Sequence, residues 1–114
     1  MDVTNIHEVK AFTTKDRSEI RELLAHRNSC LRNQSLAEAR LPPGLGTIGH
    51  HHVRSEEIYY VLEGEGMMQI EDERRPIGPG DAIAIPPGVF HRIVNKGEFM
   101  LRFLCCCAPA YEDE

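Results

Sequence analysis

From Ser35 onward, the apolar residues of the chain fall into short runs, and glycine, proline or charged residues stand at the end of each run. Runs of this length and spacing are typical of strands in an all-β sandwich or barrel. Before them, residues 16–25 are compatible with either a short helix or a turn followed by a strand. The predicted strands cover residues 35–41, 57–62, 67–70, 82–86, 91–94 and 99–107.

The length, charge and hydropathy of the chain limit the classes of protein to which it can belong. A length of 114 residues predicts one domain. The net charge is -5 and basic residues form no stripe, which disfavours nucleic-acid binding. No apolar run approaches the roughly 20 residues of a membrane-spanning helix, and the polar first residues are unlike a secretory signal. We therefore expect a cytoplasmic protein that binds neither nucleic acid nor a membrane.

The four cysteines are Cys30 and the run Cys105, Cys106 and Cys107. Neighbours along a strand point to opposite faces, so the run does not form a disulfide framework. The chain also has no CxxC pair with zinc-ribbon spacing. We interpret these cysteines as small apolar side chains in a reducing compartment, with a redox role as the alternative.

The segment "EGEG" favours a tight hairpin, with Gly64 and Glu65 as a two-residue loop. This loop would place Val61 opposite Met68. Strand alternation then gives two largely apolar faces. We expect the first to line the barrel and the second to be covered by another strand or by a second subunit, which predicts a homodimer. The first face holds Glu57, Tyr59, Val61, Met68 and Ile70, and the second holds Ile58, Tyr60, Leu62 and Met67.

Several closely spaced histidines and glutamates are candidate metal ligands. On an extended strand, His50 and His52 point to one side and His51 points to the other. Either Glu56 or Glu57 could join this pair after a bend, and His91 is a further candidate. Imidazole nitrogens and a carboxylate suit divalent iron, manganese, nickel, cobalt, copper or zinc better than calcium or magnesium.

The spacing of these residues resembles the two motifs of the cupin family, in its small single-domain, conserved-barrel form. The resemblance implies an all-β double-stranded β-helix, or jelly-roll barrel, over residues 35–110, with residues 1–34 as a strand or short helix packed on it. The first motif matches Gly44, His50, His52, Glu57 and Gly64, and the second matches Gly80, Pro86, Gly88, His91 and Asn95.

The cupin resemblance also implies a metal site. By carry-over, the metal ligands are His50, His52, Glu57 and His91, because the motif's spacing to Gly64 selects Glu57 over Glu56. Asp81 and Asn95 are interpreted as structural turn residues.

The function expected from this site is metal-dependent catalysis on a small oxygenated organic molecule. The reaction would be dioxygenase-, isomerase- or lyase-like, with Glu57 as the catalytic base. The alternative is a cupin that binds a metal or a small ligand without turnover. Whether Arg102 faces the cavity is left open by the sequence. The candidate pocket residues are Tyr59, Val61, Met68, Ile70 and Arg102.

Overall fold

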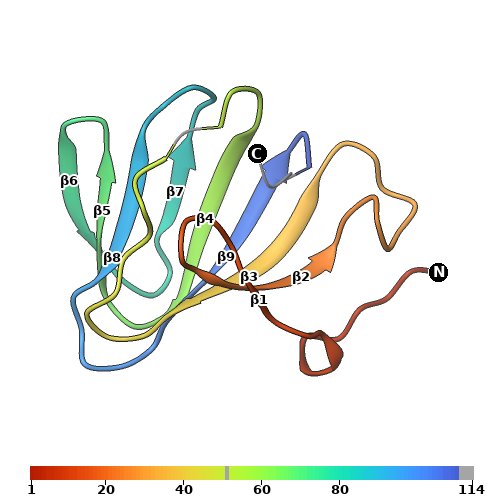
Figure 1. Ribbon diagram of the computed structural model, residues 1–114, viewed down its shortest axis with the longest axis horizontal. Helices are drawn as coiled ribbons and strands as arrows, with labels where there is room; N and C mark the ends of the chain where they lie inside the picture. Colours follow the sequence, from red (N-terminus) through yellow and green to blue (C-terminus); the bar gives the residue numbers. More distant parts are fainter. Residues whose placement is uncertain (51, 111–114) are drawn as a thin grey trace.

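The structure is a computed structural model that describes residues 1–50 and 52–110. Two antiparallel sheets face each other across the core (Figure 1). One sheet has the strand order β1-β2-β3-β9-β4-β7, and the other has the order β6-β5-β8. A short 3-10 helix, η1 (Ile6–Glu8), precedes the first strand. The strands are β1 (Phe12–Thr13), β2 (Glu19–Leu24), β3 (Ser35–Leu41), β4 (Glu56–Glu63), β5 (Gly66–Ile70), β6 (Glu73–Ile77), β7 (Ala82–Ile85), β8 (His91–Asn95) and β9 (Leu101–Ala108).

The core lies between the two sheets, as expected for a jelly-roll barrel, and the predicted all-β fold class is confirmed. Inward and outward positions alternate most clearly along β4 and β8, where every second side chain is buried. Within the described ranges, no helix is long and apolar enough to cross a membrane. The buried core consists of Ala39, Leu41, Tyr59, Val61, Met68, Ile77, Ile85, Ile93, Leu101 and Phe103.

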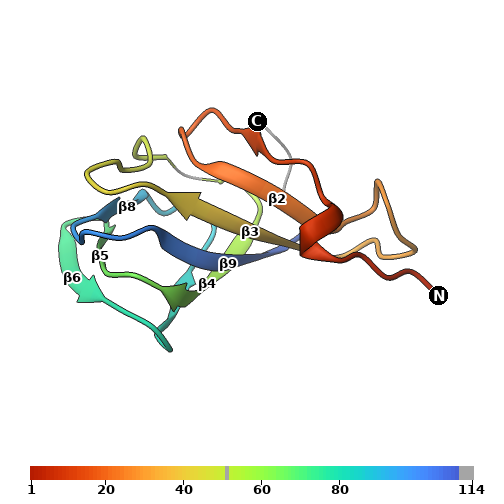
Figure 2. The same cartoon turned by 90° about the horizontal axis from the view of Figure 1, so that it is seen from below.

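The N-terminal segment extends the larger sheet. Of the two alternatives for residues 16–25, the chain adopts the turn followed by a strand, because β2 pairs antiparallel with β3. Figure 2 shows β2 alongside β3 and β9 on the same side of the molecule. A backbone hydrogen bond from Ile48 to the carbonyl of Asp16 ties the turn before β2 to the loop that follows β3. This contact brings the N-terminal segment close to the histidine-rich segment.

Two strands, β1 and β6, are absent from the sequence prediction. Strand β6 forms from a highly charged stretch that contains Pro76, and four of its five residues are exposed. Among the described strands it pairs with β5 alone, and it lies at the edge of the smaller sheet. Edge strands tolerate proline and charged side chains because one of their backbone sides needs no partner in the sheet. The missing apolar alternation therefore reflects its edge position.

The predicted hairpin of residues 57–70 is wrong. Strand β4 pairs with β7 and β9, whereas β5 pairs with β6 and β8 in the other sheet. Both edges of β4 are therefore occupied, and Val61 does not pair with Met68. The chain crosses between the sheets at Gly64, whose φ is 86° and whose added Cβ would lie 2.6 Å from the carbonyl oxygen of Met100. Only glycine fits this crossing.

The alternation predicted along β4 is nevertheless confirmed. Glu57, Tyr59 and Val61 are buried, while Ile58 and Tyr60 are exposed. Met68 is also buried, although it reaches the core from the opposite sheet. Inward and outward positions depend on the strand pleat alone, so they survive an error in strand pairing.

Candidate metal centre

Backbone pairing brings the two histidine-containing segments together. His50 and His91 exchange two backbone hydrogen bonds, of 3.1 and 2.8 Å, in an isolated β-bridge. The amide of Gly88 donates to the carbonyl of His52 at 2.7 Å, and the positive φ of Gly88, 75°, favours glycine there. Glu57 enters from the inward face of β4. Three separate segments therefore converge on one point of the barrel interior.

Two of the imidazole rings are oriented by backbone carbonyls. Nδ1 of His50 lies 2.8 Å from the carbonyl oxygen of Ile48, and Nδ1 of His91 lies 3.1 Å from that of Val89. Each Nδ1 therefore donates its proton outward, which leaves Nε2 as the acceptor that faces the site. Burial also lowers the pKa of His50, although the Ile48 carbonyl opposes this, so the ring is held in the neutral form that metals require.

Glu57 lies at the centre of the group. Its Oε1 is 2.8 Å from Nε2 of His52 and 3.2 Å from Nε2 of His91. Burial raises the pKa of Glu57, but the two imidazoles outweigh burial and hold that pKa at about 2. The thiol of Cys107 donates to the other oxygen, Oε2, at 3.3 Å. Glu56, the alternative, is exposed on the outer face.

The arrangement fits a transition-metal ion. One donor atom from each of His50, His52, Glu57 and His91 can be chosen so that all four lie within 4.8 Å of one another. Both Oε1 of Glu57 and Nε2 of His91 are buried without a well-formed hydrogen bond. Leaving buried polar atoms unpaired is costly, and a shared cation would satisfy both. Three imidazoles and one carboxylate are donors that zinc, iron, manganese, nickel, cobalt or copper accept.

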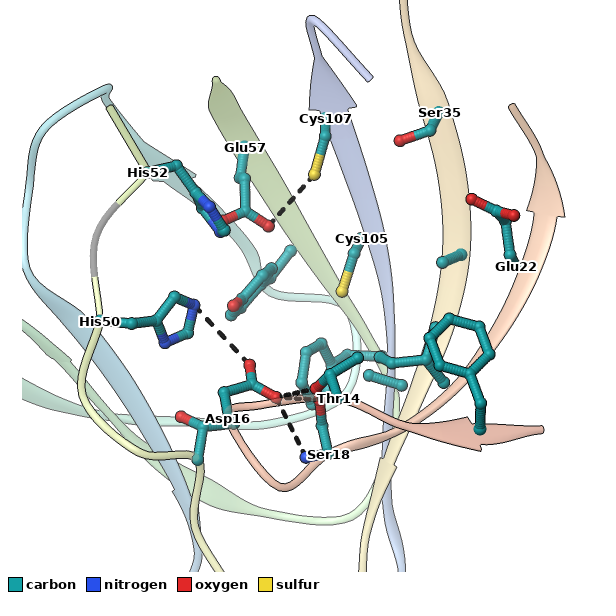
Figure 3. Close-up of a pocket in the computed structure, with 17 residues that line it drawn as sticks. Thr14, Asp16, Ser18, Glu22, Ser35, His50, His52, Glu57, Cys105 and Cys107 are labelled. Atoms are coloured by element: carbon teal, nitrogen blue, oxygen red, sulfur yellow. Dashed lines mark hydrogen bonds and ion pairs between the residues drawn. The ribbon is translucent and has the colours of Figure 1, made fainter. Parts of the chain in front are cut away.

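A cavity of about 570 Å³, open mouth included, is lined by three of the four donor residues, His50, His52 and Glu57 (Figure 3). Small side chains create this space: Ser35, Ala37 and Ala39 alternate along β3, and Cys105 and Cys107 face them from β9. Larger residues at these positions would fill the barrel.

The structure places most of the predicted pocket residues elsewhere. Tyr59 lines the cavity, but Val61 and Met68 belong to the core and Ile70 packs against it. Arg102 lies on the outer face of β9, where it donates to Glu38 at 2.7 and 2.8 Å and also pairs with Glu63. The inward positions of β9 are instead the odd-numbered ones, from Leu101 to Cys107.

The prediction of small apolar side chains holds for Cys107, which is buried, and for Cys105, which packs against the core. Cys105 and Cys107 line the cavity, while Cys30 is exposed. Burial raises the pKa of the Cys105 and Cys107 thiols, and the carboxylate of Glu57 raises both further. These thiols therefore stay protonated at neutral pH, and Cys107 can donate to Glu57.

Asp16 is a cavity residue that the sequence analysis does not single out. Alternate residues from Phe12 to Glu22 line one wall, and Asp16 is the carboxylate in the turn between β1 and β2. Its Oδ2 lies 3.7 Å from Nε2 of His50. The sequence around Asp16 carries no pattern that places this residue beside the histidines. His51, expected to point away from the site, lies outside the described residues.

Comparison with known proteins identifies the family. Residues 37–107 match the family model described as a cupin domain. The chain belongs to the cupin family. Among curated proteins, this cupin is 46% identical over 111 residues to an uncharacterized protein of Methanocaldococcus jannaschii, covering 97% of this chain and 89% of that protein. It is 34% identical over 90 residues to an oxalate-binding protein of Thermotoga maritima, covering 79% and 74% of the two chains.

A solved structure supports the same assignment for this cupin. A crystal structure from Thermotoga maritima, described as a predicted oxalate decarboxylase, superposes with a TM-score of 0.81 at 29% identity and covers 94% of this chain and 98% of that one. The predicted cupin resemblance is therefore confirmed.

Proposed function

We propose that this cupin binds a divalent transition metal through His50, His52, Glu57 and His91 and acts as a metal-dependent enzyme on a small oxygenated organic molecule. The observation that carries the proposal is the convergence of four donor atoms, two of them buried and unsatisfied, at the edge of a cavity. A metal there would supply a Lewis acid for an oxygen of the substrate. The reaction would be of dioxygenase, isomerase or lyase type.

Glu57 is the catalytic residue of this proposal. Against the effect of burial, the imidazoles of His52 and His91 lower its pKa to about 2, so its carboxylate is ionised at neutral pH and can act as a base. The hydrogen bond from Cys107 holds Oε2 while Oε1 faces the imidazoles, so the two oxygens have different surroundings. Tyr59, which also lines the cavity, is kept protonated because burial raises its pKa.

A second function is binding without turnover. The relative from Thermotoga maritima that is 34% identical carries the name oxalate-binding protein, which supports a role in ligand capture. Both functions require the same metal site, so they differ in turnover and not in the residues that hold the ligand.

Metal analysis combined with substrate screening separates the two functions. We expect protein purified without chelator to contain about one transition-metal ion per chain, and the Glu57→Gln variant to contain far less. Oxygen uptake and product formation would then be followed over phenols, diketones and hydroxy acids. Turnover supports the enzyme, and saturable binding without turnover supports the binding protein. Absence of metal from the wild-type chain, even after incubation with manganese, iron, nickel or zinc, would contradict both.

We also propose that the chain forms a homodimer through the outer face of the larger sheet. Ile58 is 51% exposed and Tyr60 is 43% exposed on β4, and β9 adds Leu104 and Cys106 beside them. This apolar surface replaces the one predicted from the hairpin, because Met67 lies in the other sheet. Such a surface favours a self-complementary contact.

Light scattering across the micromolar range should therefore give the mass of two chains. Ile58→Glu places a charge in the contact and should produce monomers. Phe99→Glu, at a loop residue that is 78% exposed, is the matched control and should stay dimeric. A wild-type monomer throughout the concentration range would remove the proposal.

A further inference from the structure

The carboxylate of Asp16 is held in a fixed orientation at the mouth of the cavity. Its Oδ1 accepts hydrogen bonds from the hydroxyl of Thr14, from the hydroxyl of Ser18 at 2.6 Å and from the amide of Ser18 at 3.1 Å. The backbone of Asp16 is fixed as well, because its carbonyl accepts from the amide of Ile48 at 2.9 Å. The side chain is 19% exposed.

This orientation turns the second oxygen of Asp16 toward the donor group. Figure 3 shows the carboxylate beside His50, with Oδ2 lying 3.7 Å from Nε2 of that ring. Asp16 is not among the four residues whose donor atoms gather together. A molecule bound by one oxygen at the four-residue site would therefore present its neighbouring substituent to Oδ2 of Asp16.

The charge of the cavity wall selects that substituent. Of the lining residues in the described parts of the chain, none is lysine or arginine, whereas two besides Glu57 are acidic. Glu22 is paired with Arg27, which leaves Asp16 as the carboxylate nearest the donor group. A second carboxylate or a phosphate at this point would lie against a fixed negative charge in a partly desolvated space. A hydroxyl or an ammonium group would instead donate a hydrogen bond to it.

The remainder of the wall is apolar. Phe12 and Ile20 contribute from the N-terminal strands, and Phe103 contributes from β9. Phe103 stacks at a tilt against Tyr59, with ring centroids 4.8 Å apart. These surfaces suit a hydrocarbon or aromatic body, because an apolar group gains free energy by leaving water.

We propose that the cavity takes a neutral or cationic vicinal diol or amino alcohol with an apolar body, whose second polar group donates a hydrogen bond to Asp16. The inference rests on the proposed metal-dependent function, since the first oxygen of the ligand is bound at the metal. Asp16 is a specificity-determining residue that disfavours an anionic group next to the metal-bound oxygen and favours a hydrogen-bond donor there.

Three matched probes test the charge preference on manganese-loaded protein. They are 2-amino-1-phenylethanol, 1-phenyl-1,2-ethanediol and mandelate, which share a phenyl ring and a benzylic hydroxyl and end in an ammonium, a hydroxyl and a carboxylate. Binding of each would be measured by calorimetry in the wild type and in Asp16→Asn. The asparagine keeps an acceptor for Thr14 and Ser18 but removes the charge. Comparing each probe between the two proteins cancels the metal's own preference for carboxylate.

We expect Asp16→Asn to weaken binding of the amine by about tenfold, because a charge-assisted hydrogen bond is lost. The same substitution should strengthen binding of mandelate by about tenfold, because a repulsion between like charges is lost. The diol should change less than either. Asp72→Asn, in the exposed turn between β5 and β6, changes the net charge equally and should leave all three affinities within about twofold. Asp16→Ser gives the same comparison if the asparagine variant does not fold.

Each other result has a distinct meaning. Equal effects on amine and mandelate, or no binding of any probe at millimolar concentration to metal-loaded protein, would overturn the assigned ligand class while leaving the metal site intact. Loss of manganese affinity in Asp16→Asn would overturn it too, because Asp16 would then be a metal ligand. Failure of the wild type to bind manganese or any other divalent transition metal would overturn the proposed function itself, and this inference with it.

Discussion

Replacing His52 with alanine should remove most of the rise in melting temperature that added metal produces. The substitution deletes one of the four donors, and Oε1 of Glu57 lies within 2.8 Å of the deleted nitrogen. A ligand that binds only the folded chain stabilises it by about 2.7 kcal/mol at a hundredfold excess over its dissociation constant. Each variant would be stripped with chelator and melted with and without manganese, iron, nickel and zinc.

Two histidine variants serve as controls for this loss. His7→Ala changes an exposed residue of the N-terminal 3-10 helix and should keep the full metal shift. His51→Ala should keep it also, because its side chain is expected to point away from the metal. If His51→Ala abolished the shift and His52→Ala retained it, the prediction that His52 and not His51 points toward the metal would be wrong.

Replacing Asn95 with alanine should lower the free energy of unfolding by roughly 3 kcal/mol. The residue is 1% exposed, and its amide group donates to the carbonyl oxygens of Leu41 and Phe99, each at 2.8 Å. Its Oδ1 also accepts from the amide of Gly97 at 2.9 Å. Alanine would leave these backbone groups without their partner, and buried unpaired carbonyls are costly. In a domain of this size, the melting temperature should fall by about 10 °C or more.

The exposed loop residue Asn33 provides the matched control for Asn95. Asn33→Ala should change the free energy of unfolding by no more than about 0.5 kcal/mol, as is usual at exposed positions. Urea denaturation followed by circular dichroism would give both values. An Asn95→Ala protein as stable as the wild type would show that water or a shifted loop replaces the lost hydrogen bonds.

Features governed by local periodicity were predictable. The side of the strand on which Glu57, Tyr59 and Val61 lie follows from the pleat, and the burial of all three agrees with it. The proximity of His50 and His91 could not be predicted in this way, because it depends on pairing between segments about forty residues apart. Only the motif spacing of a known family predicted it.

Features governed by long-range pairing were missed or misplaced. The turn at Gly64 has the local signature of a hairpin, yet both edges of β4 are taken by strands that come later in the chain. The position of Asp16 depends on β2 finding β3, and no residue near Asp16 signals that choice. Arg102 was undecided because a run of apolar residues around it hides the strand phase.

The cavity exists because five positions on β3 and β9 carry small side chains, whereas the donor group is supplied by β4, β8 and the segment before β4. The residues proposed to bind the metal and the residues that shape the ligand cavity thus lie on different strands. A change such as Ala37→Leu would shorten the space available to a ligand without touching any donor atom. Related barrels can in this way change the ligand that they bind while they keep the same metal-binding residues. Family membership therefore indicates the chemistry of the site more readily than the identity of the ligand.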